Sequence, residues 1–334
     1  MKIGNSYQMV QTPIKVGIVG TGYAATKRAE AIQADPRAQL LAVVGNSLES
    51  TEKFSQTYSI STVDSWQTLV ANPEIDLVFV CNINSSHGAI AQGALAAGKH
   101  VVVEYPLALA PLQAEALINL AKEAHKLLHV EHIELLGGVH QGIKKHLSAI
   151  GEVYYGSYST IVPQNPAPLR WTYHREMFGF PLIGALSRIT RFIDLFGEVA
   201  SVNCHNRYWE SSQRDYYRGC FCTAEIRFKQ GLIANIIYGK GETIHQAQRN
   251  LELNGDRGSL VFKGEAGSLI TSDSQTPIEV ASRRGLFNLD TLLVLDYLLE
   301  GKQLYTTAEA SYYALRVAEA ARQSAMSGKI INLV

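Results

Sequence analysis

The sequence carries no net charge and no long apolar run, and each absence excludes a class of protein. Thirty basic residues balance thirty acidic ones in a chain of 334, so no overall field attracts nucleic acid or an anionic membrane. No apolar run approaches the roughly 20 residues of a membrane-spanning helix. The N-terminal segment also lacks the apolar core of a secretory signal. We therefore expect a cytoplasmic protein that binds neither nucleic acid nor membrane.

Cysteines are few as well, and they are Cys81, Cys204, Cys220 and Cys222. None of them forms a C-x-x-C pair. Cys220 and Cys222 have the period of a strand, which places both on one face of a sheet. We favour ordinary buried thiols in a reducing cytosol over a zinc site, and we expect no metal.

The hydrophobic content is high enough for two packed domains. It amounts to 46% of the residues, and the chain is too long for one ordinary domain. Near-continuous apolar runs alternate with helical patterns in the first third, as in strands that are covered on both faces of a parallel sheet. The runs lie at 14–20, 40–45, 75–81, 99–105 and 126–132. This pattern predicts an α/β domain with a doubly wound parallel sheet, the Rossmann arrangement, over residues 1–131.

The pattern changes after this point. Longer apolar runs follow, and the stretches "KQG" (229–231) and "GDRG" (255–258) have the composition of hairpin turns. We therefore predict a second, α+β domain over residues 132–334 with one large, mostly antiparallel sheet. We expect helices at about 183–196, 287–300 and 306–325 to pack against this sheet.

A glycine-rich turn follows the first predicted strand. The stretch "VGIVGTGYAA" places Gly20, Thr21, Gly22, Tyr23 and Ala24 directly after an apolar run. In a G-x-G-x-x-A turn the first glycine allows the tight bend, and the second lets the backbone approach a pyrophosphate at the helix N-terminus. A glycine turn without a ligand is the alternative, but the strand–turn–helix context favours a dinucleotide.

The end of the second strand decides which dinucleotide is expected. An NAD site usually has an acidic residue there, and this chain has Asn46 and Ser47 instead. Without a carboxylate nothing repels a 2′-phosphate, so NADPH is favoured over NADH. Lys27, Arg28 or Lys53 could supply the positive charge.

Later strand ends supply further candidates for the same edge of the sheet. We expect Asn82 and Glu104 to contact the cofactor, since ligands of such sheets lie over the carboxyl ends of the strands. His87 is either a substrate-binding residue beside the nicotinamide ribose or an ordinary histidine in the first turn of a helix.

The combination of motifs resembles a known family. A G-x-G-x-x-A turn, the later "VEYPLALA" (103–110) and a following sheet domain are similar to the Gfo/Idh/MocA oxidoreductases. The stretches "LLHVEHIELLGGVHQ", "YSTIVPQNPAPLRWTYH" and "FGFPLIGALSRITRF" look like the cyanobacterial biliverdin reductase branch. The resemblance implies hydride transfer from NADPH to the C10 methine bridge of a linear tetrapyrrole.

Departures from the sugar-dehydrogenase pattern agree with this reading. Relatives that act on sugars carry lysine where this chain has Tyr105, and aspartate and histidine where it has Ser187 and Arg191. Oxidation of an alcohol needs a base within hydrogen-bond reach of the hydroxyl, and none of the three replacements is an obvious one. Sugar oxidation is therefore disfavoured.

The resemblance also assigns roles to residues on the substrate side. Arg188 and Tyr105 are the predicted catalytic residues: Arg188 would stabilise negative charge on the tetrapyrrole, and Tyr105 would stack on it and is a candidate proton donor. The structural alternative for Arg188 is an ion pair with Asp194 or Glu198. The remaining predicted substrate-binding residues are His129, His132, Arg170, Trp171 and Arg191. The spacing of the histidines fits no metal motif.

Two other functions remain as alternatives. One is a sugar or inositol dehydrogenase with NAD(P), and the other is a non-catalytic NADP-sensing protein on the same scaffold. The sequence leaves the oligomeric state undecided.

Overall fold

The computed structural model describes residues 11–333, and the chain forms two compact units. Unit 1 comprises Met1–Ile133 and Gly285–Tyr312, and unit 2 comprises Glu134–Arg284 and Tyr313–Val334. Residues 1–10, on which the expectation about a secretory signal rests, lie outside the described residues. Within the described part of the chain, no helix is both long and apolar enough to cross a membrane.

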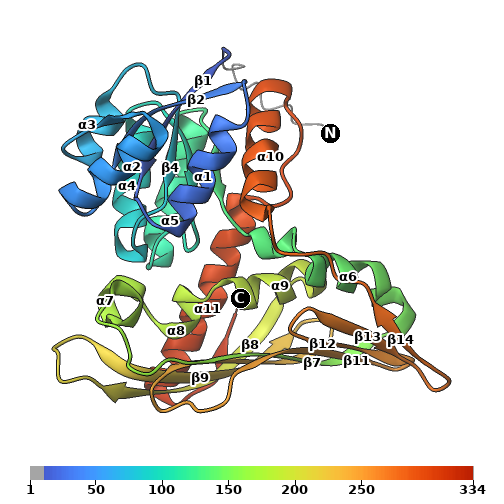
Figure 1. Ribbon diagram of the computed structural model, residues 1–334. Coiled ribbons are helices and arrows are strands. Elements are labelled where there is room, and N and C mark those ends of the chain that lie inside the picture. The colour runs from blue at the N-terminus through green and yellow to red at the C-terminus, as the bar shows by residue number, and fades with distance from the viewer. Residues whose placement is uncertain (1–10, 334) are drawn as a thin grey trace. The chain divides into compact units, whose positions relative to one another are not determined.

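Unit 1 is built on a six-stranded sheet in which every pairing is parallel, in the order β3-β2-β1-β4-β5-β6 (Figure 1). Its strands are β1 (Ile14–Val19), β2 (Ala38–Val44), β3 (Ser61–Thr62), β4 (Leu77–Val80), β5 (His100–Val103) and β6 (Leu128–Val130). Its helices are α1 (Tyr23–Gln33), α2 (Leu48–Tyr58), α3 (Trp66–Ala71), α4 (Asn84–Ala96), α5 (Pro111–Glu123) and α10 (Leu286–Glu300). The predicted doubly wound parallel sheet is confirmed.

Alternate residues of the central strands serve the two faces of this sheet. Ile14, Val16 and Ile18 of β1 are buried in the cluster that contains α1 and α10. Gly17 points the other way, and a side chain there would come within 2.7 Å of Leu69 on α3. Burying each of these large aliphatic side chains contributes about 1.5–3 kcal/mol. Both faces are therefore apolar, and this explains the unbroken hydrophobic runs in the sequence.

Helix α10 differs from the expectation drawn from the sequence. We expected residues 287–300 to pack against the large sheet of the second domain. Instead Val294, Leu295 and Leu298 lie in the core of unit 1, and α10 packs against α1. Sequence order alone does not show that the chain returns to its first unit after about 150 residues in the other.

Unit 2 contains a nine-stranded sheet in the order β14-β13-β12-β11-β7-β10-β9-β8-β15. Only the β7–β10 pair is parallel. The strands are β7 (Val153–Pro163), β8 (Val199–Glu210), β9 (Tyr217–Phe228), β10 (Ile233–Gly241), β11 (Gln248–Gly255), β12 (Gly258–Lys263), β13 (Ala266–Ile270), β14 (Gln275–Ile278) and β15 (Ile331–Asn332). Both predicted hairpins are confirmed, since β9 pairs with β10 and β11 pairs with β12 in antiparallel register.

Helices cover one face of this large sheet (Figure 1). They include α6 (Gly138–His146), α7 (Arg175–Phe178), α8 (Pro181–Gly184) and α9 (Ser187–Phe196), with the short 3₁₀ helices η1 (Ile133–Leu135), η2 (Leu147–Ile150) and η3 (Trp171–Tyr173) nearby along the chain. The long α11 (Ala308–Ser327) is shared between the two units. Helix α9 approaches β7 closely because Gly156 leaves room for Phe192, whose ring would lie 2.6 Å from a side chain at that position. This close packing fixes the helix that carries Arg188 and Arg191.

The cysteines of the large sheet have the predicted positions. Cys204, Cys220 and Cys222 are buried free thiols, and Phe221 between the last two is less buried. Cys220 and Cys222 therefore share one face of β9. Burial raises the pKa of Cys220.

Candidate active site

The glycine-rich turn lies where the strand order of the unit 1 sheet reverses, between β1 and β4. Gly20 has φ +122°, and a Cβ there would lie 2.3 Å from the carbonyl oxygen of Cys81, just after β4. Only glycine tolerates both this conformation and this close approach. The turn therefore brings the two strand ends together at the position where open α/β sheets bind their ligands.

Gly22 stands at the N-cap of α1, in extended conformation. A Cβ at Gly22 would meet nothing within 4 Å, and no side chain caps the helix there. The first N–H groups of α1 thus have no acceptor within the helix, and no side chain at Gly22 blocks the approach of a ligand to them. The arrangement fits the pyrophosphate of a dinucleotide, because helix N-termini bind phosphate through such groups.

The turn after β2 adjoins the glycine turn. Gly45 lies against the side chain of Thr21, with room only for a hydrogen at its Cα. Ser47 caps α2 by accepting a hydrogen bond from the N–H of Ser50, and Asn46 is exposed. This turn contains no acidic side chain. A carboxylate here would repel a 2′-phosphate, so its absence suits NADPH.

The structure excludes one of the three residues that were suggested to supply positive charge to the 2′-phosphate. Arg28 has no exposed surface and donates hydrogen bonds inside unit 1, so it does not offer a cation to a ligand beside Asn46. Lys27 is partly exposed but pairs with Glu30 at 2.7 Å. Lys53 is exposed, and it stays a candidate.

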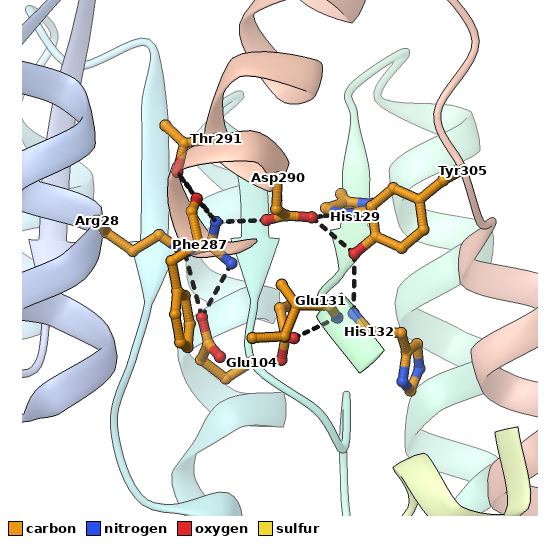
Figure 2. Close-up of polar contacts among 10 residues, drawn as sticks. Arg28, Glu104, His129, Glu131, His132, Phe287, Asp290, Thr291 and Tyr305 are labelled. Atoms are coloured by element: carbon orange, nitrogen blue, oxygen red, sulfur yellow. Dashed lines mark hydrogen bonds and ion pairs between the residues drawn. The ribbon is translucent and has the colours of Figure 1, made fainter. Parts of the chain in front are cut away.

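Arg28 is the centre of a buried polar network (Figure 2). Its Nε and Nη2 donate to Oε1 of Glu104 at 3.3 and 3.1 Å, and its Nη1 donates to Asp290 and, at 3.0 Å, to Oγ1 of Thr291. The guanidinium also lies 5.3 Å from the ring of Phe79. Arg28 therefore ties α1 to α10 and to the end of β5, where Glu104 was predicted to meet the cofactor.

Charge in this network is unevenly distributed. Burial by itself would lower the pKa of Arg28, but Asp290 and Glu104 outweigh it and raise that pKa. Burial, followed by the nearby Glu104 and Asp290, raises the pKa of Glu131 well above its ordinary value. Two carboxylates, those of Glu104 and Asp290, thus share one guanidinium, and burial favours the protonated form of the nearby Glu131.

Removal of this guanidinium should destabilise unit 1 strongly. We expect Arg28→Met to lower the free energy of unfolding by about 3–5 kcal/mol, because the buried carboxylate of Asp290 loses its cationic partner. Arg37→Met is the matched control, since Arg37 pairs with Asp35 and Asp296 but is 30% exposed. Its cost should be about 1 kcal/mol. Urea unfolding measures both, and equal losses would contradict the role assigned to Arg28.

Tyr105 follows Glu104 and stacks on a histidine. Its ring lies parallel to that of His132, with centroids 5.4 Å apart. His132 is buried, with Nε2 2.9 Å from Oγ of Ser311, and its backbone N–H donates to the hydroxyl of Tyr305. Tyr305 in turn donates to Asp290 at 2.7 Å. The partly exposed Tyr105 ring is therefore supported from behind by the same network that holds Glu104.

The other predicted histidines of unit 1 are buried as well. His129 has Nε2 2.9 Å from Oδ1 of Asp290, inside the network. His87 lies with Nδ1 2.8 Å from the carbonyl oxygen of Pro106 and Nε2 2.9 Å from that of Asn82. It thereby joins the loops after β4 and β5, and burial lowers its pKa. Contact of His87, His129 and His132 with a substrate stays a prediction.

Buried neutral histidines make the stability of unit 1 sensitive to acid. Burial lowers the pKa of His132 from 6.5 to about 3 and that of His100 to about 4. The unfolded chain takes up these protons below pH 6.5, whereas the folded chain does not until pH 4 or 3. Stability is therefore complete above pH 6.5 and falls as the pH drops towards these values, by about 2 kcal/mol per histidine at pH 5. His100→Gln should show a smaller loss of melting temperature between pH 7 and pH 5 than the unmodified protein, and an unchanged loss would contradict the assignment.

Three of the substrate-side residues predicted in unit 2, Arg170, Trp171 and Arg188, gather around one lysine. Lys240 of β10 is 7% exposed, and its Nζ lies 3.6 Å from the ring centroid of Phe178. The ring of Trp171 packs against Phe178 at 6.0 Å. Arg188 lies over Tyr238, which also adjoins Lys240. Burial is the main cause that lowers the pKa of Lys240, and the nearby Arg170 and Arg188 lower it further. Arg170 and Trp171 come from one segment and Arg188 from another, and the three therefore share one neighbourhood.

Arg188 and Arg191 have different surroundings although they are one turn apart. Arg188 is partly exposed and donates to Oγ of Ser187 at 3.0 Å. Arg191 is buried, lies over the ring of Tyr158 and pairs with Glu134 at 3.1 Å. Asp194, suggested as an alternative partner of Arg188, lies 2.8 Å from Nε2 of His140. The predicted roles of Arg188 and Arg191 towards substrate stay predictions.

Two central residues were not predicted from the sequence. Asp290 sits in an apolar helix, where a lone aspartate at a core position is the signal that could have exposed it. Lys240 lies near the end of the apolar strand β10. Every second residue of this strand is buried in line with it, so the period of the strand predicts its inward position. No group of three potential metal ligands occurs within residues 11–333.

Comparison with known proteins covers both units. Residues 14–132 match the model described as an oxidoreductase family with an NAD-binding Rossmann fold, Gfo/Idh/MocA, and residues 144–333 match the C-terminal alpha/beta domain of the same family. Mouse biliverdin reductase A is 30% identical over 73% of this chain and 77% of its own.

Solved structures extend this similarity. The biliverdin reductase of Synechocystis sp. PCC 6803, crystallised with biliverdin and NADP+, is 56% identical and covers 94% of this chain and 99% of its own, with a TM-score of 0.92. An aldose-aldose oxidoreductase from Caulobacter crescentus, at 21% identity, covers 96% of this chain and 99% of its own, with a TM-score of 0.83. The similarity to the Caulobacter protein shows only that the two chains share a fold.

Proposed function

Because the chain belongs to the Gfo/Idh/MocA oxidoreductase family, we propose that it is an NADPH-dependent biliverdin reductase. Hydride would add to the C10 methine bridge of biliverdin and a proton to a pyrrole nitrogen, which gives bilirubin. The observation that carries the proposal is the 56% identity, over almost the whole chain, with an enzyme crystallised with biliverdin and NADP+.

The dinucleotide side of the proposal depends on unit 1. NADPH supplies the hydride when it is bound. Gly20 and Gly22 leave space for its pyrophosphate, and the N–H groups of α1 would hold the phosphates. The absence of an acidic side chain beside Asn46 and Ser47 favours the 2′-phosphate form. The Arg28 network would keep Glu104 and Tyr105 in place at the end of β5.

The pigment side depends on aromatic surface and positive charge. Biliverdin is a flat conjugated molecule with two carboxylates, and hydride addition pushes electron density onto a ring nitrogen. Arg188 is a permanent cation, so it would stabilise this negative charge and not give up its own proton. Tyr105 offers a partly exposed ring for stacking and a phenol that is protonated at neutral pH.

Side chains at the sugar-dehydrogenase positions argue against alcohol oxidation. Ser187 is buried and accepts a hydrogen bond from Arg188. Arg191 is buried in an ion pair with Glu134. Neither is a base that could take a proton from a hydroxyl at neutral pH. A polyol substrate would therefore lack a proton acceptor at these positions.

The direct test mixes the purified protein with biliverdin and NADPH and follows the growth of bilirubin absorbance. We expect turnover with NADPH and weaker turnover with NADH. Incubation with NADP+ and a panel of polyols is the parallel measurement. Reduction of NADP+ by a polyol, with biliverdin left unchanged, would replace the proposal with a sugar dehydrogenase. Binding of NADPH without turnover of either substrate class would indicate a sensor.

A further inference from the structure

Lys240 occupies a cage of aromatic rings in unit 2. Its Nζ lies 3.6 Å from the ring centroid of Phe178, 4.8 Å from that of Tyr173, 5.5 Å from that of Tyr217 and 5.8 Å from that of Tyr238. The ammonium also donates a hydrogen bond to the carbonyl oxygen of Thr172. Ring faces attract a cation, but they leave its charge without a counterion.

The charged groups around the cage increase this imbalance. Arg170 precedes η3 and Arg188 lies on α9, and both repel the ammonium. Arg188 and Lys240 lie over the same ring, that of Tyr238. Among the described residues, no carboxylate lies within 4.0 Å of Lys240 Nζ. Glu242, two residues further on, instead accepts from the N–H of Ala167 and lies 3.8 Å from Arg218.

A buried ammonium near two guanidinium groups, with no carboxylate within 4.0 Å, either loses its proton or is stabilised by an anion from outside the chain. We propose that Lys240 is a positioning residue for an anionic substrate. Its protonation state would determine how strongly the neighbouring Arg170 and Arg188 attract a carboxylate-bearing pigment. The ligand class follows from the excess of positive charge and from the aromatic surface around it. This inference rests on the proposed function in taking biliverdin as the anion.

The proton on Lys240 should be lost within an accessible pH range. Burial is the main cause that lowers the pKa of Lys240 to about 8. Burial raises the pKa of Tyr173 to about 12 and also raises that of Tyr217 and of Cys220, so these neighbours stay neutral. The guanidinium groups keep their charge. Lys240 therefore changes from cation to neutral amine between pH 7 and 9, whereas the pKa values of Tyr173, Tyr217 and Cys220 are shifted upward.

Thermodynamic linkage between protonation of Lys240 and binding of biliverdin gives the direction in which pH should change the affinity. A bound carboxylate favours the protonated amine, so biliverdin should bind more tightly below pH 8 than above it. Binding should also take up a proton at higher pH. One titrating group weakens binding by at most tenfold per pH unit, so we expect the dissociation constant of biliverdin to rise about tenfold between pH 7 and 9.

The test titrates biliverdin into the full chain in the presence of NADP+, which prevents turnover, at several pH values from 7 to 9. Lys240→Met keeps an apolar side chain of similar length in the cage, and it should bind about tenfold more weakly at pH 7 with almost no dependence on pH. Lys240→Arg keeps the charge at every pH, so its affinity should be independent of pH. Lys229→Met is the matched control, because Lys229 is 55% exposed in an ion pair with Glu198. It should behave like the unmodified protein.

The outcomes separate this inference from the proposed function. A pH-independent affinity in the unmodified protein, or the same pH dependence in Lys240→Met, would overturn the role of Lys240 even if biliverdin is reduced. Binding with the expected pH dependence but no reduction by NADPH would support Lys240 and refute the reductase. Absence of any biliverdin binding would refute both. A melting curve of Lys240→Met checks that a weaker affinity does not reflect unfolding.

Discussion

Gly22→Asp should abolish NADPH binding while the protein stays folded. The position is open, since a Cβ there meets no atom of the protein within 4 Å, and an N-terminal aspartate is tolerated or favoured by a helix. The new carboxylate would, however, occupy the space and the charge that the N–H groups of α1 offer to the pyrophosphate. We expect the dissociation constant for NADPH to rise at least about 100-fold, or ~3 kcal/mol.

The measurement is quenching of protein fluorescence by NADPH, with a melting curve on the same sample. Gly20→Ala is the informative contrast, because its Cβ would lie 2.3 Å from the carbonyl oxygen of Cys81. This variant should lose stability, whereas Gly22→Asp should lose only affinity. If Gly22→Asp retained its affinity, the dinucleotide would not lie on this turn.

Arg188→Ala should have the second large effect, on turnover. If Arg188 stabilises negative charge that develops as hydride arrives, its removal should lower kcat by about 100- to 1000-fold, as for other preorganised groups that face developing charge. The affinity for NADPH should be almost unchanged, because that site is formed by unit 1. Single-turnover absorbance measurements with saturating NADPH separate the chemical step from binding.

Two further variants define this effect. Arg188→Lys keeps a cation but loses the planar guanidinium, so it should recover part of the rate. Arg227→Ala removes an arginine that is 59% exposed in unit 2 and pairs with Glu225, and it should leave kcat unchanged. An unchanged kcat in Arg188→Ala would remove this residue from the reaction and leave Tyr105 as the remaining predicted catalytic group.

Features that depend on neighbouring residues were readable from the sequence. The strand–turn–helix around Gly20 and Gly22 is local, because the positive φ of the first glycine and the free helix N-terminus are set by a few adjacent residues. The two sheet types were equally readable, since unbroken apolar runs and hairpin turns report directly on burial and pairing. The missing acid beside Asn46 likewise indicated the form of the dinucleotide.

Features that depend on distant residues were decided only by the tertiary structure. Arg28 and Asp290 are separated by 262 positions, and only the return of α10 to the first unit brings them together. Lys240 acquires its cage from four separate elements of the second unit. The cost of a buried charge depends on which groups surround it. Residue order states that the chain has a lysine and an arginine at these positions, but only the folded chain determines that Arg28 pairs with carboxylates and that Lys240 lies among aromatic rings.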